Sequence, residues 1–263
     1  MPKYLTIVFW IPILCFTLLW FWMILPSFNR REETVRYLRK GFAHRGLHSD
    51  EVPENSLAAF RQAKTAGYGI ELDIQLTKDG KVVVLHDANL LRATGINRNV
   101  ADVTWDEIQN LKIFESTETV PLLSDVLKEM VDVPLLVELK GEVNGKELCP
   151  AAAKQLDSYR GPYAIESFNP LIVRWFRKNR PYVLRGQLSS KFSGNELSPA
   201  LRFVITNLLT NHFSRPNFVA YDIRHRHQIS FQLCRFLYHV PIVAWTVHPE
   251  DSADCFDGVI FEK

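Results

Sequence analysis

From Gly41 to the C-terminus, short apolar runs rich in β-branched residues alternate with amphipathic stretches. The apolar runs predict strands at Phe42–Arg45, Ile70–Leu76, Val82–His86, Pro134–Leu139, Tyr163–Ser167, Val183–Leu188, Phe218–Tyr221, Ile242–Val247 and Gly258–Phe261. The amphipathic stretches predict helices at Ser56–Ala66, Trp105–Leu111, Leu123–Val131, Glu147–Ser158, Pro170–Lys178 and Gln228–Tyr238. Strands that alternate with helices in this way are typical of a parallel sheet buried on both faces.

About eight such strand–helix units within some 220 residues favour an α/β fold, a compact TIM-like (β/α)8 barrel, over an open sheet. The polar stretch from Ala88 to Val120 is interpreted as an excursion from the barrel. Because the active site of a TIM barrel lies at the C-terminal ends of its strands, polar residues there are the candidates for function. They are His44, Arg45, Asp73, His86, Glu138, Lys140, Glu166 and Trp245.

A different pattern precedes the barrel, because no charged residue occurs from Tyr4 to Asn29. Roughly 20 apolar helical residues cross a bilayer, so residues 1–29 are expected to form a transmembrane anchor that precedes the main domain. A cleaved signal peptide is the weaker alternative, since no A-x-A-like site follows Leu25. Residues 30–40 form a basic juxtamembrane segment, and the positive-inside rule places the domain of residues 41–263 on the cytoplasmic side. These expectations make the chain a single-pass membrane protein whose partners include the lipid bilayer.

Composition narrows the class of function further. The net charge of +2 is close to neutral and offers no footprint for nucleic acid. Cysteines at positions 15, 149, 234 and 255 are widely spaced and form no C-x-x-C pair, so we expect no disulfide framework.

An acidic pair marks the strand predicted at Ile70–Leu76. Glu71 and Asp73 are two residues apart, so they share one face of the strand, with Cα atoms about 7 Å apart. Glu138, near the end of another strand, supplies a third carboxylate. Oxygen-only ligation suits Mg²⁺, Ca²⁺ or Mn²⁺ rather than zinc, and we favour a divalent-cation site over ion pairing on a solvated strand.

Two histidines accompany these acids. His44 and His86 both lie near strand ends, and an imidazole can give or take a proton near neutral pH. Cleaving a phosphodiester requires both a base for the nucleophile and an acid for the leaving alkoxide, so we interpret this pair as catalytic. The remaining histidines, at positions 48, 212, 225, 227, 239 and 248, are interpreted as surface or structural residues.

Arg45 and Lys140 are cations beside the same expected mouth. A guanidinium binds two phosphate oxygens at once and an ammonium acts as a point charge, so both are predicted to bind the phosphate, with internal ion pairs as the alternative. Trp245 offers an apolar wall for the alcohol part of a substrate, although an aromatic residue in a strand can equally belong to the core.

Taken in order, these residues resemble the glycerophosphodiester phosphodiesterase family. The resemblance is carried by His44-Arg45-Gly46, Pro53-Glu54-Asn55-Ser56, Glu71-Leu72-Asp73, His86-Asp87, Glu138-Leu139-Lys140, Ser167-Phe168 and Ala244-Trp245-Thr246-Val247. It covers nearly all of residues 41–260. The resemblance implies a TIM-barrel hydrolase that converts glycerophosphodiesters to glycerol 3-phosphate and an alcohol. It also implies Mg²⁺ or Ca²⁺ on Glu71, Asp73 and Glu138, and attack on phosphorus by the substrate's own 2-hydroxyl.

Two departures and three alternatives accompany this resemblance, and one departure is that His248 follows Trp245-Thr246-Val247 where an asparagine or a similar polar residue is frequent. The chain ends shortly after Gly258–Phe261, where family members commonly continue into a closing helix, and the segment with Val35, Tyr37 and Leu38 is a candidate to cover that gap. The nearest alternative activity is lysophospholipase D-type cleavage of lysophospholipids. An inactive barrel that binds phosphodiesters or partner proteins is less favoured because both histidines and all three carboxylates are present. A sphingomyelinase D-like phosphotransferase, which would share the barrel and the use of two histidines, is also less favoured.

Overall fold

A closed sheet forms the centre of the computed structural model, which describes residues 3–141, 144–192 and 197–263. Its strands are β1 (Phe42–Ala43), β2 (Gly69–Leu76), β3 (Val82–Val84), β4 (Leu135–Leu139), β5 (Tyr163–Ser167), β6 (Leu184–Ser189), β7 (Phe218–Asp222), β8 (Ile242–Val247) and β9 (Gly258–Phe261). Their order is β1-β9-β8-β7-β6-β5-β4-β2-β3, and a further pairing of β1 with β2 closes the sheet. Without β3, eight parallel strands surround the barrel axis, which confirms the predicted TIM-like fold.

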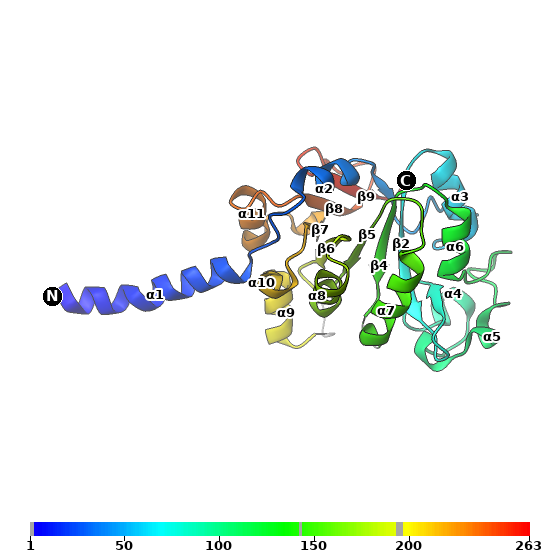
Figure 1. Cartoon of the computed structure of the whole chain (residues 1–263), viewed down its shortest axis with the longest axis horizontal. Coiled ribbons are helices and arrows are strands. Elements are labelled where there is room, and N and C mark those ends of the chain that lie inside the picture. The colour runs from blue at the N-terminus through cyan, green and yellow to red at the C-terminus, as the bar shows by residue number, and fades with distance from the viewer. Residues whose placement is uncertain (1–2, 142–143, 193–196) are drawn as a thin grey trace.

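Helices surround the strands (Figure 1). They are α1 (Lys3–Met23), α2 (Arg31–Leu38), α3 (Leu57–Thr65), α4 (Leu91–Thr94), α5 (Trp105–Ile108), α6 (Leu123–Glu129), α7 (Gly145–Leu156), α8 (Pro170–Asn179), α9 (Pro199–Thr206), α10 (Asn211–Ser214) and α11 (Ile229–Phe236), with 3₁₀ turns η1 (Val100–Asp102) and η2 (Ile223–His225). Local signals start several of them. The Ser56 side chain accepts a hydrogen bond from Ala59 N, and Asn169 does the same for Leu171 N. The sequence did not predict α9 and α10.

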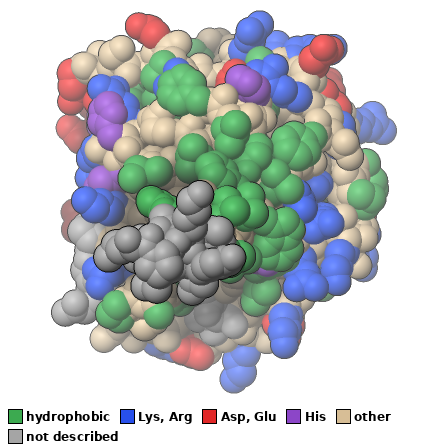
Figure 2. Space-filling model, turned by 90° about the vertical axis from the view of Figure 1, so that its left-hand side faces the viewer, with side chains coloured by type: hydrophobic (Ala, Val, Ile, Leu, Met, Phe, Trp, Pro, Cys, Tyr) green, Lys and Arg blue, Asp and Glu red, His purple; other side chains and the backbone are tan. Residues whose placement is uncertain are grey.

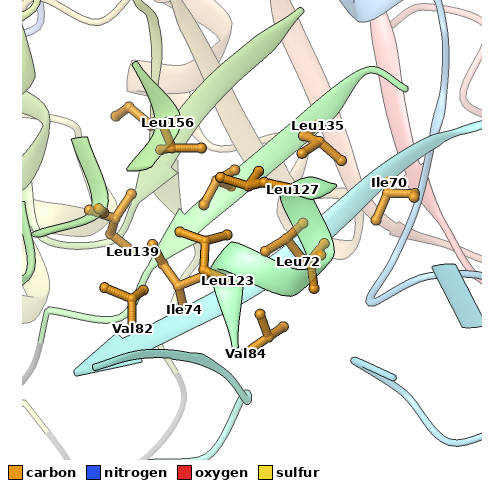
Figure 3. Packing of buried hydrophobic residues seen from close by; sticks show 14 of the residues in the cluster. Ile70, Leu72, Ile74, Val82, Val84, Leu123, Leu127, Leu135, Leu139 and Leu156 are labelled. Carbon is orange, nitrogen blue, oxygen red and sulfur yellow. The ribbon is translucent and has the colours of Figure 1, made fainter. Parts of the chain in front are cut away.

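The alternation of side chains along the strands divides the core into two parts. In β2, Ile70, Leu72 and Ile74 face outward and pack with β4 residues beneath α6 and α7 (Figure 3). Glu71 and Asp73 therefore face the other way, into the barrel. The interior carries its own apolar cluster, whose members include Phe42, Leu136, Ala164, Phe218, Val243 and Ile260. Because that cluster fills the barrel, the acidic pair is held in a surround of low polarity.

Strand β3 differs from the expectation that every strand runs parallel. It pairs antiparallel with β2, with Ile74 opposite Val84. An apolar run of three valines does not reveal its direction, so the sequence could not show this. The consequence is functional, because β3 turns the chain back along β2 until Leu85 N donates to Asp73 O at 3.0 Å. His86 thereby returns to the barrel mouth.

The predicted excursion forms a small unit with a core of its own. Residues 88–120 contribute Leu90, Val100, Ile108 and Ile113 to an apolar cluster that also includes Val83 of β3. This confirms that the segment leaves the barrel and packs outside it. The four cysteines are all free, as expected.

The expected transmembrane anchor is not supported. Among the described residues, no helix is long and apolar enough to cross a membrane. The expectations of a single-pass location and of a cytoplasmic-side domain lose their basis with it. A physical reason is that the end of the apolar stretch packs into the domain. Trp20 Nε1 donates to Ser230 Oγ at 3.1 Å, Tyr238 OH donates to Phe21 O at 2.9 Å, and Ile24 is fully buried.

Helix α1 otherwise extends away from the barrel (Figure 1). Figure 2 shows hydrophobic side chains gathered around this projecting helix, with lysines and arginines beyond them. The Phe203 ring of α9 meets Trp20 of α1 edge-on at 5.7 Å, and half of Phe203 stays exposed.

Helix α2 lies under the N-terminal ends of the barrel strands. Tyr37 OH donates to Leu135 O at the start of β4. Leu38 is fully buried, and a Cβ added to Gly258 at the start of β9 would lie 2.7 Å from Leu38 O. Glycine at position 258 therefore permits the close approach of helix and strand. The segment before the first strand therefore packs against this end of the barrel.

Candidate active site

Three buried carboxylates meet at the C-terminal ends of β2 and β4. Glu71, Asp73 and Glu138 are 2%, 1% and 7% exposed, and one oxygen of each lies within 4.8 Å of the others. The register places Asp73 directly opposite Glu138 in the parallel pair. The structure thus brings the three carboxylates together as predicted, with Glu71 and Asp73 on one face of their strand and Glu138 on the neighbouring strand.

The electrostatics of these carboxylates are those of a cation site. Burial raises the pKa of Glu71 well above its usual value, and the charges of Asp73 and Glu138 raise it further. Burial also raises the pKa of Glu138, to about 7. Burial acts in the same sense on Asp73, but Lys140, His86 and Arg45 outweigh it and hold the pKa of Asp73 below its usual range. Oxygen-only donors that repel one another fit a hard divalent cation such as Mg²⁺ or Ca²⁺.

Basic side chains enclose the carboxylates. Lys140 Nζ lies 2.8 Å from Glu138 Oε1 and 3.0 Å from Asp73 Oδ1. Arg45 donates from its backbone N to Glu71 Oε2 at 2.9 Å, and its Nε lies 3.4 Å from Asp73 Oδ2. Arg45 and Lys140 thus form the internal ion pairs that the sequence analysis gave as the alternative to phosphate binding. Both cations also line the pocket, so a phosphate entering it would meet them.

Asn55, from the motif Pro53-Glu54-Asn55-Ser56, is hydrogen-bonded to one member of the acidic pair. Its Nδ2 donates to Asp73 Oδ2 at 2.8 Å, and its Oδ1 accepts from Asp73 N at 3.3 Å. Asn55 is 1% exposed and has a φ of +54°. An asparagine tolerates this left-handed conformation better than most residues, so the loop after β1 can reach the acidic pair.

His86 begins a chain of charged partners. Its Nδ1 lies 2.6 Å from Asp87 Oδ1, and Asp87 also pairs with Arg92. Arg92 NH2 donates to Glu54 Oε1 at 2.6 Å, and the same oxygen accepts from Arg45 NH1 at 2.9 Å. Burial lowers the pKa of His86. The network therefore fixes the imidazole and links it to the arginine beside the carboxylates.

His44 has a carboxylate partner from the other end of the chain. Its Nδ1 lies 2.5 Å from Glu262 Oε1, because β1 and β9 are neighbours in the barrel. The hydrogen bond with His44 lowers the pKa of Glu262. Two further imidazoles surround the same carboxylate, with His48 Nε2 at 3.8 Å and His248 Nδ1 at 3.9 Å.

The candidates share one pocket of about 110 Å³. Its apolar wall consists of Phe168, Leu188 and Trp245, with the ring of Trp245 edge-on to Phe168 at 5.5 Å. Glu166 lines it as well; this carboxyl is 1% exposed and its Oε2 has no hydrogen-bond partner.

The residues predicted from the sequence to bind a metal ion, to bind substrate or to exchange protons converge on this mouth, and so does Glu166. The pocket is lined by His44, Arg45, Glu71, His86, Glu138, Lys140 and Trp245, and Asp73 completes the carboxylate group. The sequence did not identify Glu262, Arg92 or Glu54 as supporting residues. Glu54, like Asp87, lies inside one of the motifs that carry the family resemblance, and this position could have marked both as site residues. Glu262 and Arg92 lie outside those motifs, so the sequence did not mark them.

The fold and the site together define a TIM-barrel protein of the phosphodiesterase type, in which three buried carboxylates that could hold a metal ion share the barrel mouth with two histidines. Comparison with known families agrees. The Glycerophosphoryl diester phosphodiesterase family matches residues 44–253, and the chain belongs to this family.

Several relatives share part of the chain. It is 34% identical over 148 residues to Lysophospholipase D GDPD1 of Rattus norvegicus, covering 51% of this chain and 46% of that protein. It is 38% identical over 159 residues to a Glycerophosphodiester phosphodiesterase of Caldanaerobacter subterraneus, covering 56% of this chain and 65% of the relative. The chain thus spans about half to two thirds of the length of these two relatives.

Solved structures show the same fold. A Putative glycerophosphoryl diester phosphodiesterase from Silicibacter pomeroyi superposes with a TM-score of 0.67 at 22% identity, covering 84% of this chain and 88% of that one. A phosphodiesterase from Oleispira antarctica, solved in complex with the product sn-glycerol-3-phosphate, has a TM-score of 0.67 at 21% identity, with 86% and 94% covered.

Proposed function

We propose that this protein hydrolyses glycerophosphodiesters to glycerol 3-phosphate and an alcohol, with residues 41–263 as the catalytic domain. The observation that carries the proposal is the meeting of Glu71, Asp73 and Glu138 with two imidazoles at one barrel mouth. Family membership and the relative named as a glycerophosphodiester phosphodiesterase support the same reaction. The bound product in the Oleispira antarctica structure supports the substrate class.

The carboxylates would hold one divalent cation, Mg²⁺ or Ca²⁺. Their oxygen-only donor set fits such an ion, and burial, with the charge of neighbouring carboxylates, raises the pKa values of Glu71 and Glu138 while no ion is bound. When bound, the ion polarises a phosphoryl oxygen. Lys140, which now bridges Asp73 and Glu138, would share the neutralisation of these acids with the ion and turn toward the phosphate.

His44 and His86 would exchange the protons. Each has its Nδ1 hydrogen-bonded to a carboxylate, Glu262 for His44 and Asp87 for His86. This arrangement leaves Nε2 as the nitrogen that exchanges a proton with substrate, as in other histidines oriented by a carboxylate. One imidazole takes the proton of the nucleophile and the other gives one to the leaving alkoxide. Arg45 would bind phosphate oxygens, and Trp245 would border the alcohol.

Lysophospholipase D-type cleavage is the second candidate. The observation that favours it is the 34% identity to a protein named lysophospholipase D. Both reactions cut the bond between phosphate and head-group alcohol, so the same acids and imidazoles serve either. The difference lies in an acyl chain, which the apolar wall of Phe168, Leu188 and Trp245 would have to border.

The test is a comparison of rates on glycerophosphocholine and lysophosphatidylcholine, measured with the purified full chain. Chelation should abolish release of glycerol 3-phosphate, and either Mg²⁺ or Ca²⁺ should restore it. Turnover of lysophosphatidylcholine alone would replace the first candidate by the second. No turnover of either, by folded protein with each cation, would leave an inactive binding barrel.

A further inference from the structure

A second group of potential metal ligands lies at the rim of the barrel mouth, apart from the three carboxylates. His44, His48 and Glu262 each offer one ligand atom, and these atoms lie within 4.8 Å of one another. His248 Nδ1 lies 3.9 Å from the other oxygen of Glu262. The group combines the first and last parts of the barrel sequence, since Glu262 follows β9 and the loop after β1 supplies His44 and His48.

The distances between these donor atoms lie on either side of the spacing found in a small tetrahedral site. Glu262 Oε1 lies 2.5 Å from His44 Nδ1 and 3.8 Å from His48 Nε2. Adjacent ligand atoms of a tetrahedral zinc ion lie about 3.3 Å apart, between these two values. His48 Nε2 is buried and has no hydrogen-bond partner, although it points toward a carboxylate. A metal ion would satisfy this nitrogen.

We propose that His44, His48, Glu262 and His248 form a second, transition-metal site that binds Zn²⁺ and withdraws His44 from catalysis. Donor chemistry separates the two sites. Imidazole nitrogens suit Zn²⁺ and similar ions, whereas the oxygen-only group of Glu71, Asp73 and Glu138 suits Mg²⁺ or Ca²⁺. All four side chains of the second site are partly exposed, so an ion has access.

The effect on His44 follows from its two nitrogens. A neutral imidazole that coordinates through Nδ1 carries its remaining proton on Nε2, so this nitrogen can no longer accept a proton. The ion also takes over the carboxylate that orients the ring. Bound Zn²⁺ should therefore inhibit the phosphodiesterase reaction. This inhibitory part rests on the proposed function, whereas binding of the ion does not.

The binding test uses the full chain, stripped of metal and kept in saturating Mg²⁺. Calorimetry should show one Zn²⁺ bound per chain, and Co²⁺ in its place should give the strong visible absorption of a four-coordinate site with nitrogen ligands. His48→Gln should weaken Zn²⁺ binding by about tenfold or more. His227→Gln, a histidine outside the group, and Asp73→Asn, which alters the other site, should bind Zn²⁺ as the wild type does.

The activity test uses the same variants. Zn²⁺ should inhibit the wild type and the His227→Gln variant, whereas His48→Gln should keep the wild-type basal rate and resist inhibition. His248→Gln gives a second measure should His48→Gln fail to fold. Unweakened Zn²⁺ binding in both histidine variants, or the weak absorption of an octahedral oxygen site with Co²⁺, would overturn the proposal. Histidine-dependent binding by a chain without turnover would refute the proposed function and leave the site standing.

Discussion

The side chains of His44 and Glu262, 218 residues apart in the sequence, meet at 2.5 Å between Nδ1 and Oε1. Closure of the barrel brings them together, because Ala43 of β1 is in register with Phe261 of β9. A carboxylate on one ring nitrogen fixes the orientation of an imidazole and the nitrogen that carries its proton. Glu262 therefore acts through His44 as a positioning residue.

We expect Glu262→Gln to lower kcat on glycerophosphocholine by about 10- to 100-fold, the usual cost of losing a carboxylate that orients a functional histidine. KM should change little, because Glu262 does not line the substrate pocket. Glu262→Asp should recover part of the rate. The exposed Glu250 provides the matched control as Glu250→Gln. If kcat falls only in proportion to the fall in melting temperature in Glu262→Gln and Glu262→Asp, the carboxylate has a purely structural role.

The two acids of β2 should differ in what they contribute to stability. Glu71→Gln and Asp73→Asn are both expected to lower glycerol 3-phosphate release by at least about 100-fold, since each removes an oxygen ligand. Asp73 is bonded to Asn55 and paired with Arg45 and Lys140, so neutralising it removes one carboxylate partner from each of these buried cations.

Asp73→Asn should therefore cost about 3 kcal/mol of unfolding free energy. Glu71→Gln should be nearly neutral, because it relieves repulsion with Asp73. Urea denaturation measures both. Full activity in either variant would contradict the cation site.

Both the backbone conformation and the close packing at Gly46, directly after His44 and Arg45, require a glycine. Its φ is +81°, and an added Cβ would lie 2.8 Å from Ala59 Cβ and 2.9 Å from the Ala59 carbonyl carbon. Gly67 has a similar φ of +78° but nothing within 4 Å of the added atom. Gly67→Ala should cost about 1 kcal/mol for the conformation alone.

Gly46→Ala should cost about 2–4 kcal/mol, because a clash with backbone is added to that conformational term. It should also lower kcat, since the displaced loop carries His44. Thermal melting and turnover of the two variants measure the difference. Identical stability losses would show that the α3 contact is easily relieved.

The sequence predicted the barrel and the residues at its mouth because both can be recognised from patterns of residues close together in the chain. The run at Tyr163–Ser167 was correct to the residue, and the Glu71–Asp73 spacing determined that both acids share a face. The direction of β3 and the partner of His44 depend instead on contacts distant in sequence. The prediction of a transmembrane anchor before Asn29 was not supported for a related reason. Apolar composition alone does not show whether a side chain is buried by lipid or, as Ile24 is, by the rest of the protein.

Leu38 should be a major stabilising residue at the closed end of the barrel. It is fully buried in the interior cluster with Phe42 and Ile260, and it lies against Gly258. Leu38→Ala should lower the free energy of unfolding by about 3 kcal/mol through lost burial and a cavity. Turnover at a temperature well below the melting point should not change, because the site lies at the opposite ends of the strands. Loss of less than 1 kcal/mol would mean that α2 is not a fixed cover.

The two ends of α1 should respond differently to substitution. Ile24, just past its last residue, is fully buried with Leu208, Val219 and other residues of one apolar cluster, whereas Leu14 is 59% exposed. Ile24→Ala should therefore cost about 2–4 kcal/mol of unfolding free energy, and Leu14→Ala less than about 0.5 kcal/mol. Urea denaturation of both variants tests this. A large loss for Leu14→Ala as well would show that the projecting part of α1 is buried by something outside the described chain, and two small losses would show that α1 is not docked at all.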